Sequence, residues 1–365
     1  MVIPSPKNNV LLFAFFLLIS YPLFYFCYKF GTPEMGTNDY YQYYKLYKNW
    51  DYASVDAPFN TRIISPYLVY LFGKLNISYD ANIIFSKIGY DPKVYFHAVF
   101  INYISTVLTC FVIFKTIEKL LMNRIVALLG GIIYLLGFGT CFYNLTGLTD
   151  AFSSLLFALT FYFYFQKSPY IFIVLLLAVI QREYILLVLG LMSVIHILSE
   201  KENKKYHIRV LAVSVLCFGF YFILRKTLFM TPPSADHETF EGQVEVGSYF
   251  GRMFNYTIHD WPAFIRQTIL SQNLVFIYLG LLLYKFSTKQ KINKINLLLV
   301  VLLFFQENII NFLAYLGNNG GRCFYMIMPL IVYFTAIEAR PLLENYFRMD
   351  GSLAGKPLTE KPGNV

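Results

Sequence analysis

Two adjacent charged residues, Arg182 and Glu183, stand in the middle of the apolar run LLLAVIQREYILLVLG at 175–190. A charged side chain at the centre of a bilayer costs at least about 2.5–3.5 kcal/mol, so charges at that depth usually have a function. Because neighbouring residues on a helix do not face each other, each side chain is expected to meet a different partner. The guanidinium suits a phosphate group, and the carboxylate suits a hydroxyl or a basic group. Both residues are therefore candidates for substrate binding.

An acidic residue, Asp39, ends the sequence GTND and precedes the aromatic stretch YYQYY. A carboxylate held close to an apolar interface can act as a general base toward the hydroxyl of an acceptor molecule. The same residue types also begin helices, so the alternative is that Asn38 or Asp39 caps the helix that starts here. The sequence leaves both interpretations open.

Two further arginines are candidates for binding an anion. Arg62 lies in FNTRIISPYL, and its planar guanidinium suits bidentate binding of phosphate. Arg322 lies in LGNNGGRCFYM, where the backbone amides of a Gly-Asn loop at a helix N-terminus would add to an anion cradle. The alternative for both is that a long basic side chain anchors a helix among lipid headgroups.

Asp150, in LTGLTDAFSSLL, is expected in the first turn of a helix that Thr149 caps. That position is structural in many proteins, and a contact with substrate is the alternative. The loop 227–270 contains His, Glu and Asp residues, but the paired spacing of a motif such as HExxH is absent. We therefore predict no metal site.

Composition indicates the environment in which these residues must work. The chain is 57% hydrophobic and only 14% charged, with a mean hydropathy of +0.52, whereas soluble domains carry roughly 25% charged residues. The alternating segments of an outer-membrane barrel are absent. The net charge of +9 is typical of basic cytoplasmic loops rather than of nucleic-acid binding. The prediction is an all-α polytopic membrane protein with about ten transmembrane helices. The five cysteines are expected to be buried free thiols: Cys27, Cys110, Cys141, Cys217 and Cys323.

Basic segments determine the predicted topology. Lys and Arg concentrate in short cytoplasmic loops, and the sequence has four such segments, at 115–124, 166–169, 199–209 and 285–294. All four lie on one side if membrane helices occupy 10–29, 94–114, 125–145, 149–166, 207–226, 271–286, 295–315 and 322–339. The segment 168–198 must then form a hairpin of two short helices that turns near Gln181–Glu183. A single long helix with an internal salt bridge is the alternative, and it would place the later basic loops outside.

The segment 30–93 is expected to be a large outer loop with two interfacial helices, NDYYQYYKLYKNW and RIISPYLVYLFGKL. The second spans about 14 residues, roughly 21 Å at ~1.5 Å per residue, which is too short to cross a hydrocarbon core of about 30 Å. The predicted organisation is a membrane module at 1–230, an outer loop at 231–270, further transmembrane helices at 271–340 and a disordered cytoplasmic tail at 341–365. Both termini are expected in the cytoplasm.

The arrangement of these motifs resembles the GT-C superfamily of integral-membrane glycosyltransferases. The resemblance rests on a first helix, an outer loop with an early Asp and interfacial helices, a TDA turn, and an RE pair in short helices, and it covers about residues 10–230. It implies a multi-helix module with its active site at the outer face. The sugar donor would be a polyprenyl-phosphate carrier, and the acceptor a glycan, a lipid or a protein. No cofactor is implied beyond this lipid-linked donor.

Carried over to this chain, the resemblance makes Asp39 the catalytic base. It makes Arg62, Arg182 and Arg322 candidates for the carrier phosphate, and Asp150 and Glu183 candidates for acceptor or sugar contacts. The paired acids that are common in the superfamily are absent, because only Asn38 precedes Asp39, and this leaves Asp51 and Asp56 as rival bases. The implied reaction is an inverting transfer at the outer face of a bacterial inner membrane.

Three other functions stay open. A polymerase or ligase of envelope polysaccharides would also use lipid-linked sugars, but would depend on Arg and His in the loop 227–270. A transporter or flippase of lipid-linked or anionic solutes would perform no chemistry. A structural membrane subunit would use its charges only to bind partner helices.

Overall fold

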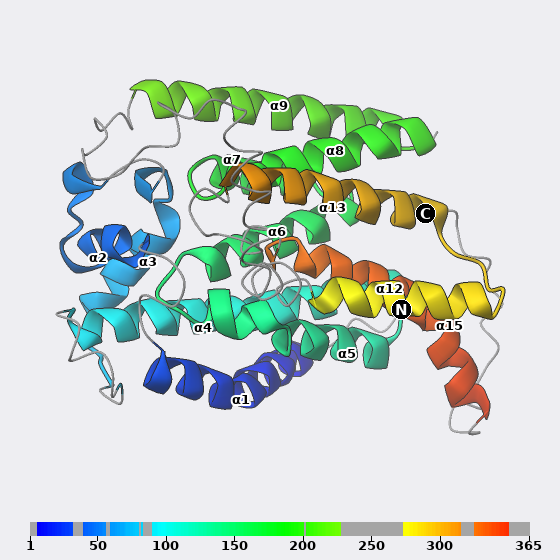
Figure 1. Ribbon diagram of the computed structural model, residues 1–365, viewed down its shortest axis with the longest axis horizontal. Helices are drawn as coiled ribbons and strands as arrows, with labels where there is room; N and C mark the ends of the chain where they lie inside the picture. The colour runs from blue at the N-terminus through cyan, green and yellow to red at the C-terminus, as the bar shows by residue number, and fades with distance from the viewer. Residues whose placement is uncertain are drawn as a thin grey trace, which may run out of the picture.

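A computed structural model describes most of the chain as a bundle of helices (Figure 1), and no strand occurs in the part it describes. The described residues are 6–31, 39–55, 59–79, 82, 90–200, 202–227, 273–314 and 325–349. Within them, three helices are long and apolar enough to cross a membrane, namely Asn8–Phe30, Pro92–Leu121 and Lys204–Thr227. The predicted all-α membrane class is therefore supported, whereas the expected number of spans stays a prediction.

The helix α4 (Pro92–Leu121) lies in the middle of the bundle and contacts α1 (Pro6–Phe30), α5 (Arg124–Leu135) and α6 (Asp150–Phe165). Thirty residues at ~1.5 Å each give about 45 Å, more than a hydrocarbon core of about 30 Å requires. Asp91 caps its N-terminus by accepting a hydrogen bond from the backbone of Lys93 at 2.9 Å. α4 is therefore the frame on which the other helices pack.

The predicted hairpin at 168–198 is present. α7 (Ile171–Val179) and α8 (Tyr184–Ser199) are separate helices, and the chain between them is not helical. The side chain of Gln181, in this turn, reaches Ser153 near the start of α6, whereas His196, near the end of α8, meets Tyr164 near the end of α6. α8 therefore runs parallel to α6, and α7, which contacts both, runs in the opposite direction. The alternative of one continuous helix is wrong.

One end of the bundle carries the basic connections. Tyr164 of α6 shares its hydroxyl with His196 of α8, at 3.0 Å, and with His207 of α9 (Lys204–Thr227), at 2.9 Å. Lys119, near the end of α4, bonds Gln166. These contacts bring three of the basic segments to the same end, which lies on the right in Figure 1.

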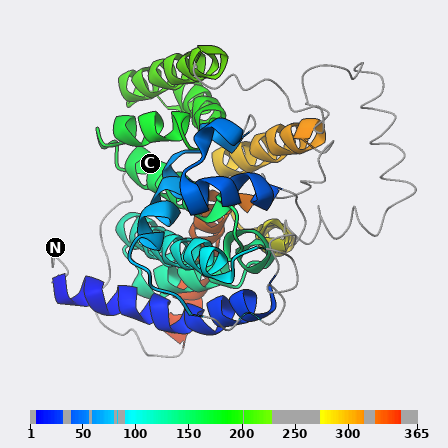
Figure 2. The same cartoon turned by 90° about the vertical axis from the view of Figure 1, so that its left-hand side faces the viewer.

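The opposite end is covered by α2 (Asp39–Asn49) and α3 (Ile64–Gly73), which face the viewer in Figure 2. Both match the short helices predicted in the first loop. Tyr40, Tyr43 and Tyr47 of α2 are buried at helical spacing, and this face packs against α3 and α4. The two short helices thus form a layer across the end of the bundle.

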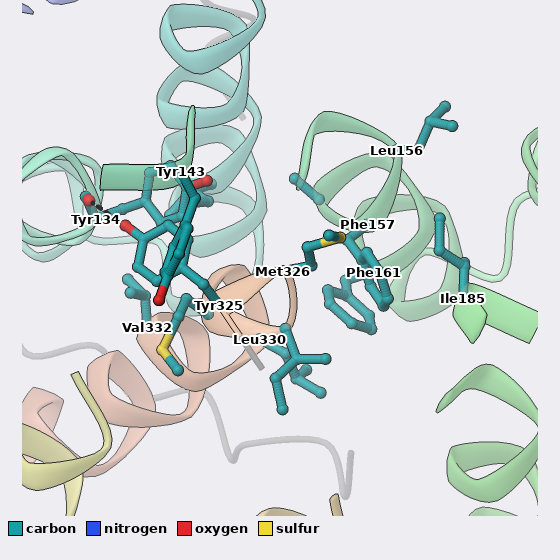
Figure 3. Close-up of a cluster of buried hydrophobic side chains, with 14 of the residues drawn as sticks. Tyr134, Tyr143, Leu156, Phe157, Phe161, Ile185, Tyr325, Met326, Leu330 and Val332 are labelled. Carbon is teal, nitrogen blue, oxygen red and sulfur yellow. Dashed lines mark hydrogen bonds between the residues drawn. The ribbon is translucent and has the colours of Figure 1, made fainter. Parts of the chain in front are cut away.

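The helix predicted over 125–145 is interrupted. α5 ends at Leu135, and a π-helical turn, η4 (Thr140–Asn144), follows after a short break. Tyr325 explains the break, because its ring packs against Gly137 and Gly139, where no side chain would fit. Its hydroxyl also contacts Thr140, at 2.5 Å. Figure 3 shows Tyr325 between Tyr134 and Tyr143 in this part of the core.

The C-terminal helices are α12 (Asn273–Ser287), α13 (Lys294–Ala314) and α15 (Met328–Met349). A buried ion pair between Lys285 of α12 and Glu338 of α15 joins two of them. α15 continues to Met349, and so extends into the range expected for the tail, while 350–365 lie outside the described residues.

Candidate active site

Arg182, a charged residue within an apolar segment, forms a buried ion pair. Its Nη2 atom donates to Oδ1 of Asp150 at 3.1 Å, and the two residues are 2% and 1% exposed. Arg182 belongs to the turn between α7 and α8, and Asp150 begins α6. The carboxylate compensates the guanidinium and also lies at the positive end of the α6 dipole. Arg182 thus fixes the hairpin turn against the start of α6.

The same turn is bound to the start of α3. The backbone N–H of Ser65 donates to Oε1 of Gln181 at 3.1 Å, and the amide of Gln181 reaches Oγ of Ser153 at 3.4 Å. In addition, the backbone N–H of Ile63 donates to the carbonyl of Ile180 at 3.0 Å. These bonds place Arg62, which directly precedes Ile63, beside the hairpin turn.

Arg62 is half-buried and is held by a tyrosine. Its Nη1 atom donates to the hydroxyl of Tyr43 at 2.5 Å, and Thr149 donates to the same hydroxyl at 3.2 Å. Thr149 precedes Asp150, so the arginine, the tyrosine and the buried ion pair form one connected group. Thr149 does occupy the N-cap position of α6, but its side chain makes no capping hydrogen bond. The predicted cap is thus replaced by a contact with Tyr43.

Asp39 begins α2 one helical turn before Tyr43 and is half-buried. Residues four apart lie on the same face of a helix, with about 5–6 Å between their Cβ atoms. Asp39 therefore lies on the face of α2 that meets Arg62 and Thr149. Burial raises the pKa of the neighbouring Tyr40 well above its ordinary value of 10.0, so that phenol stays neutral.

Glu183 lies near α9, a helix that the contacts described above do not include. It is half-buried and lies within electrostatic range of the hydroxyl of Tyr221, on α9. Arg62 and Arg225 lie within electrostatic range of the same hydroxyl. α9 therefore contributes a cation and a phenol to the group that contains Arg62.

The loop that leads into Thr149 is held at several points. The side-chain amide of Asn102, on α4, donates to the carbonyls of Thr146 and Leu148 at 2.6 and 2.5 Å. The hydroxyl of Tyr47 donates to the carbonyl of Gly147 at 2.9 Å. These bonds tie the start of α6 to α4 and α2.

Gly147 lies so close to the ring of Tyr40 that a Cβ atom there would collide with it. We expect Gly147→Ala to lower the free energy of unfolding by about 1–3 kcal/mol, the usual cost of overpacking a core. Gly219→Ala is the matched control, because nothing lies within 4 Å of a Cβ atom at that helical position. Denaturant unfolding in mixed micelles measures both. Equal stability of the two variants would contradict the predicted contact.

Contacts through Tyr43 and Thr149 bring together three of the predicted site residues, Arg62, Asp150 and Arg182. Asp39 lies one helical turn before Tyr43, and Glu183 directly follows Arg182. The sixth, Arg322, lies outside the described residues, as do the rival base Asp56 and the loop 228–272. The other rival, Asp51, is exposed and lies beyond the C-terminus of α2. Within the described residues, no group of three or more His, Cys, Asp or Glu could hold a metal ion.

Sequence reasoning did not single out several members of the site: Tyr43, Gln181, Tyr221 and Arg225. Tyr43 had a usable signal, because it lies four residues after Asp39 and so shares its helix face. Gln181 adjoins Arg182 in the predicted turn and is polar at the same depth. Comparisons of the chain with protein-family models, with curated proteins and with solved structures found no match.

Proposed function

We propose that this protein is a membrane glycosyltransferase that transfers a sugar from a polyprenyl-phosphate carrier to an acceptor hydroxyl. The observation that carries the proposal is the half-buried guanidinium of Arg62, held by Tyr43 beside the Asp150–Arg182 ion pair and next to the helix face of Asp39. A guanidinium binds phosphate in a fixed geometry, and a carboxylate accepts a proton from a hydroxyl. The group therefore offers the two functions that the transfer needs.

The basic connections at the opposite end of the bundle support an orientation for this reaction. Lys and Arg concentrate in cytoplasmic loops, so the end that carries 166–169 and 199–209 would face the cytoplasm. Arg62 and Asp39 would then face outward, at the level of the lipid headgroups. A carrier with its chain in the bilayer would present its phosphate at that level.

In the proposed reaction, Asp39 takes the proton of the acceptor hydroxyl while its oxygen attacks the anomeric carbon. The bond between that carbon and the phosphate oxygen breaks, and the phosphate leaves with the bonding electrons. Arg62 stabilises the negative charge of the departing phosphate. A single displacement of this kind inverts the configuration at the anomeric carbon.

Arg182 and Asp150 have a different role in this proposal. Because they are buried and bound to each other, they position the start of α6 and the hairpin turn around Arg62. Glu183 and Arg225, on the side of Tyr221, are the candidates for contacts with the sugar or acceptor. The donor is a co-substrate, and the proposed reaction requires no further cofactor.

The test is an assay of carrier-dependent transfer with the full chain in lipid nanodiscs. Polyprenyl-phosphate hexoses and pentoses are supplied with mixed glycan, lipid and peptide acceptors, and released polyprenyl phosphate is measured. Arg62→Gln is expected to lower the rate by about 10²–10³-fold, because it removes the charge that stabilises the leaving group.

Arg124→Gln is the matched control, because this arginine is 58% exposed and pairs with Glu118 on another part of the bundle; its rate should equal that of the wild type. Solute movement across vesicles without release of carrier would instead favour a transporter. Release that is insensitive to Arg62→Gln would favour a polymerase or ligase that uses the loop 227–270.

A further inference from the structure

Two cysteines far apart in the sequence meet at the end of the bundle that carries the candidate site. Cys27 lies in the last turn of α1, and Cys141 lies in the π-helical turn η4. The Sγ atom of Cys27 donates to the backbone carbonyl oxygen of Cys141 at 3.7 Å. Both are in the free thiol form.

The two thiols of the pair differ in their exposure. Cys27 is 9% exposed, whereas Cys141 is half-buried and so is the more accessible of the two. The other described cysteines, Cys110 of α4 and Cys217 of α9, are buried on separate helices. Contact between α1 and η4 keeps the two residues next to each other.

We propose that Cys27 and Cys141 form a reversible disulfide through exchange with a small-molecule or protein disulfide. The thiolate of Cys141 attacks one sulfur of the donor disulfide and forms a mixed disulfide, and the first donor thiol leaves. The thiolate of Cys27 then attacks Sγ of Cys141, and the second donor thiol leaves. Two cysteine thiols are oxidised, the donor disulfide is reduced to two thiols, and both protons pass to water or to the leaving thiolates.

The bond would act on the segment that precedes the candidate site. η4 ends at Asn144, and the loop that follows leads directly to Thr149 and Asp150. A covalent link from α1 to η4 therefore adds a fixed point to a loop that Asn102 and Tyr47 already hold by hydrogen bonds. This inference concerns thiol chemistry and does not depend on the proposed transferase activity.

The test uses the purified full chain in detergent and glutathione disulfide as the donor. After oxidation, remaining thiols are alkylated and the protein is digested and analysed by mass spectrometry. We expect a peptide pair that joins Cys27 to Cys141, a mass loss of roughly 2 Da for the two hydrogens removed, and complete reversal by dithiothreitol. Cys27→Ala and Cys141→Ala should each abolish the link.

Cys217→Ala is the matched control and should leave the link intact, since Cys217 lies on α9. A lasting glutathione adduct on Cys141 without a bond to Cys27 would overturn the proposal, as would a full set of free thiols after oxidation or a link to a different cysteine. The cross-linked peptides of the wild-type protein show by themselves whether Cys27 and Cys141 are joined. The test therefore holds even if an alanine variant does not fold.

Discussion

Replacing Asp150 with Ala is expected to lower the free energy of unfolding by about 3–5 kcal/mol, because it breaks a buried ion pair and removes the carboxylate that compensates the charge of its partner. The partner is Arg182, which is 2% exposed and 3.1 Å from the carboxylate. The guanidinium cannot lose its proton to escape the cost of burial. Denaturant unfolding in mixed micelles measures the loss.

A double variant distinguishes the effect of the buried charge on stability from the effect of lost packing. In Asp150→Ala with Arg182→Leu, the buried charge is gone, so the protein should regain most of the lost stability. Asp51→Ala is the matched control, because this carboxylate is exposed and its loss should change stability by no more than about 0.5 kcal/mol. A single Asp150→Ala variant as stable as Asp51→Ala would contradict a structural role for the pair.

The hairpin could be predicted from the sequence because a physical penalty pointed to it. Charges at membrane depth are costly, and placing all basic loops on one side required the chain to turn at Gln181–Glu183. The structure confirms that turn. It does not follow from the sequence that Arg182 pairs with Asp150, because the two are 32 positions apart and only the packing of α7 against α6 brings them together.

The interruption of the helix predicted over 125–145 could not be predicted either, because it also depends on a residue that is distant in sequence. Hydropathy is continuous through this segment, and the break depends on Tyr325, which is distant in sequence and packs onto Gly137 and Gly139. Tyr43 was missed for another reason. It is one of 31 tyrosines in the chain, and its spacing from Asp39 becomes informative only beside its contacts with Arg62 and Thr149. Local patterns predicted the elements, and long-range contacts decided the site.

Asp39→Asn is expected to lower the rate of sugar transfer by about 10²–10⁴-fold, the usual contribution of a general base. The amide has nearly the same shape as the carboxylate but cannot accept the proton of the acceptor hydroxyl. Because Asn is also a good residue for a helix N-terminus, α2 should still begin at this position. The fold should therefore be retained, and the measurement is the initial rate of carrier release at saturating donor.

The same assay distinguishes Asp39 from its described rival. Asp51 is exposed and lies beyond the C-terminus of α2, so Asp51→Asn should transfer sugar at the wild-type rate. If Asp39 acts as the base, its Asn variant should lose the rate while donor binding stays close to that of the wild type, since the phosphate contacts Arg62 instead. Equal rates for Asp39→Asn and wild type would remove Asp39 from the reaction and leave Asp56 as the acid to test next.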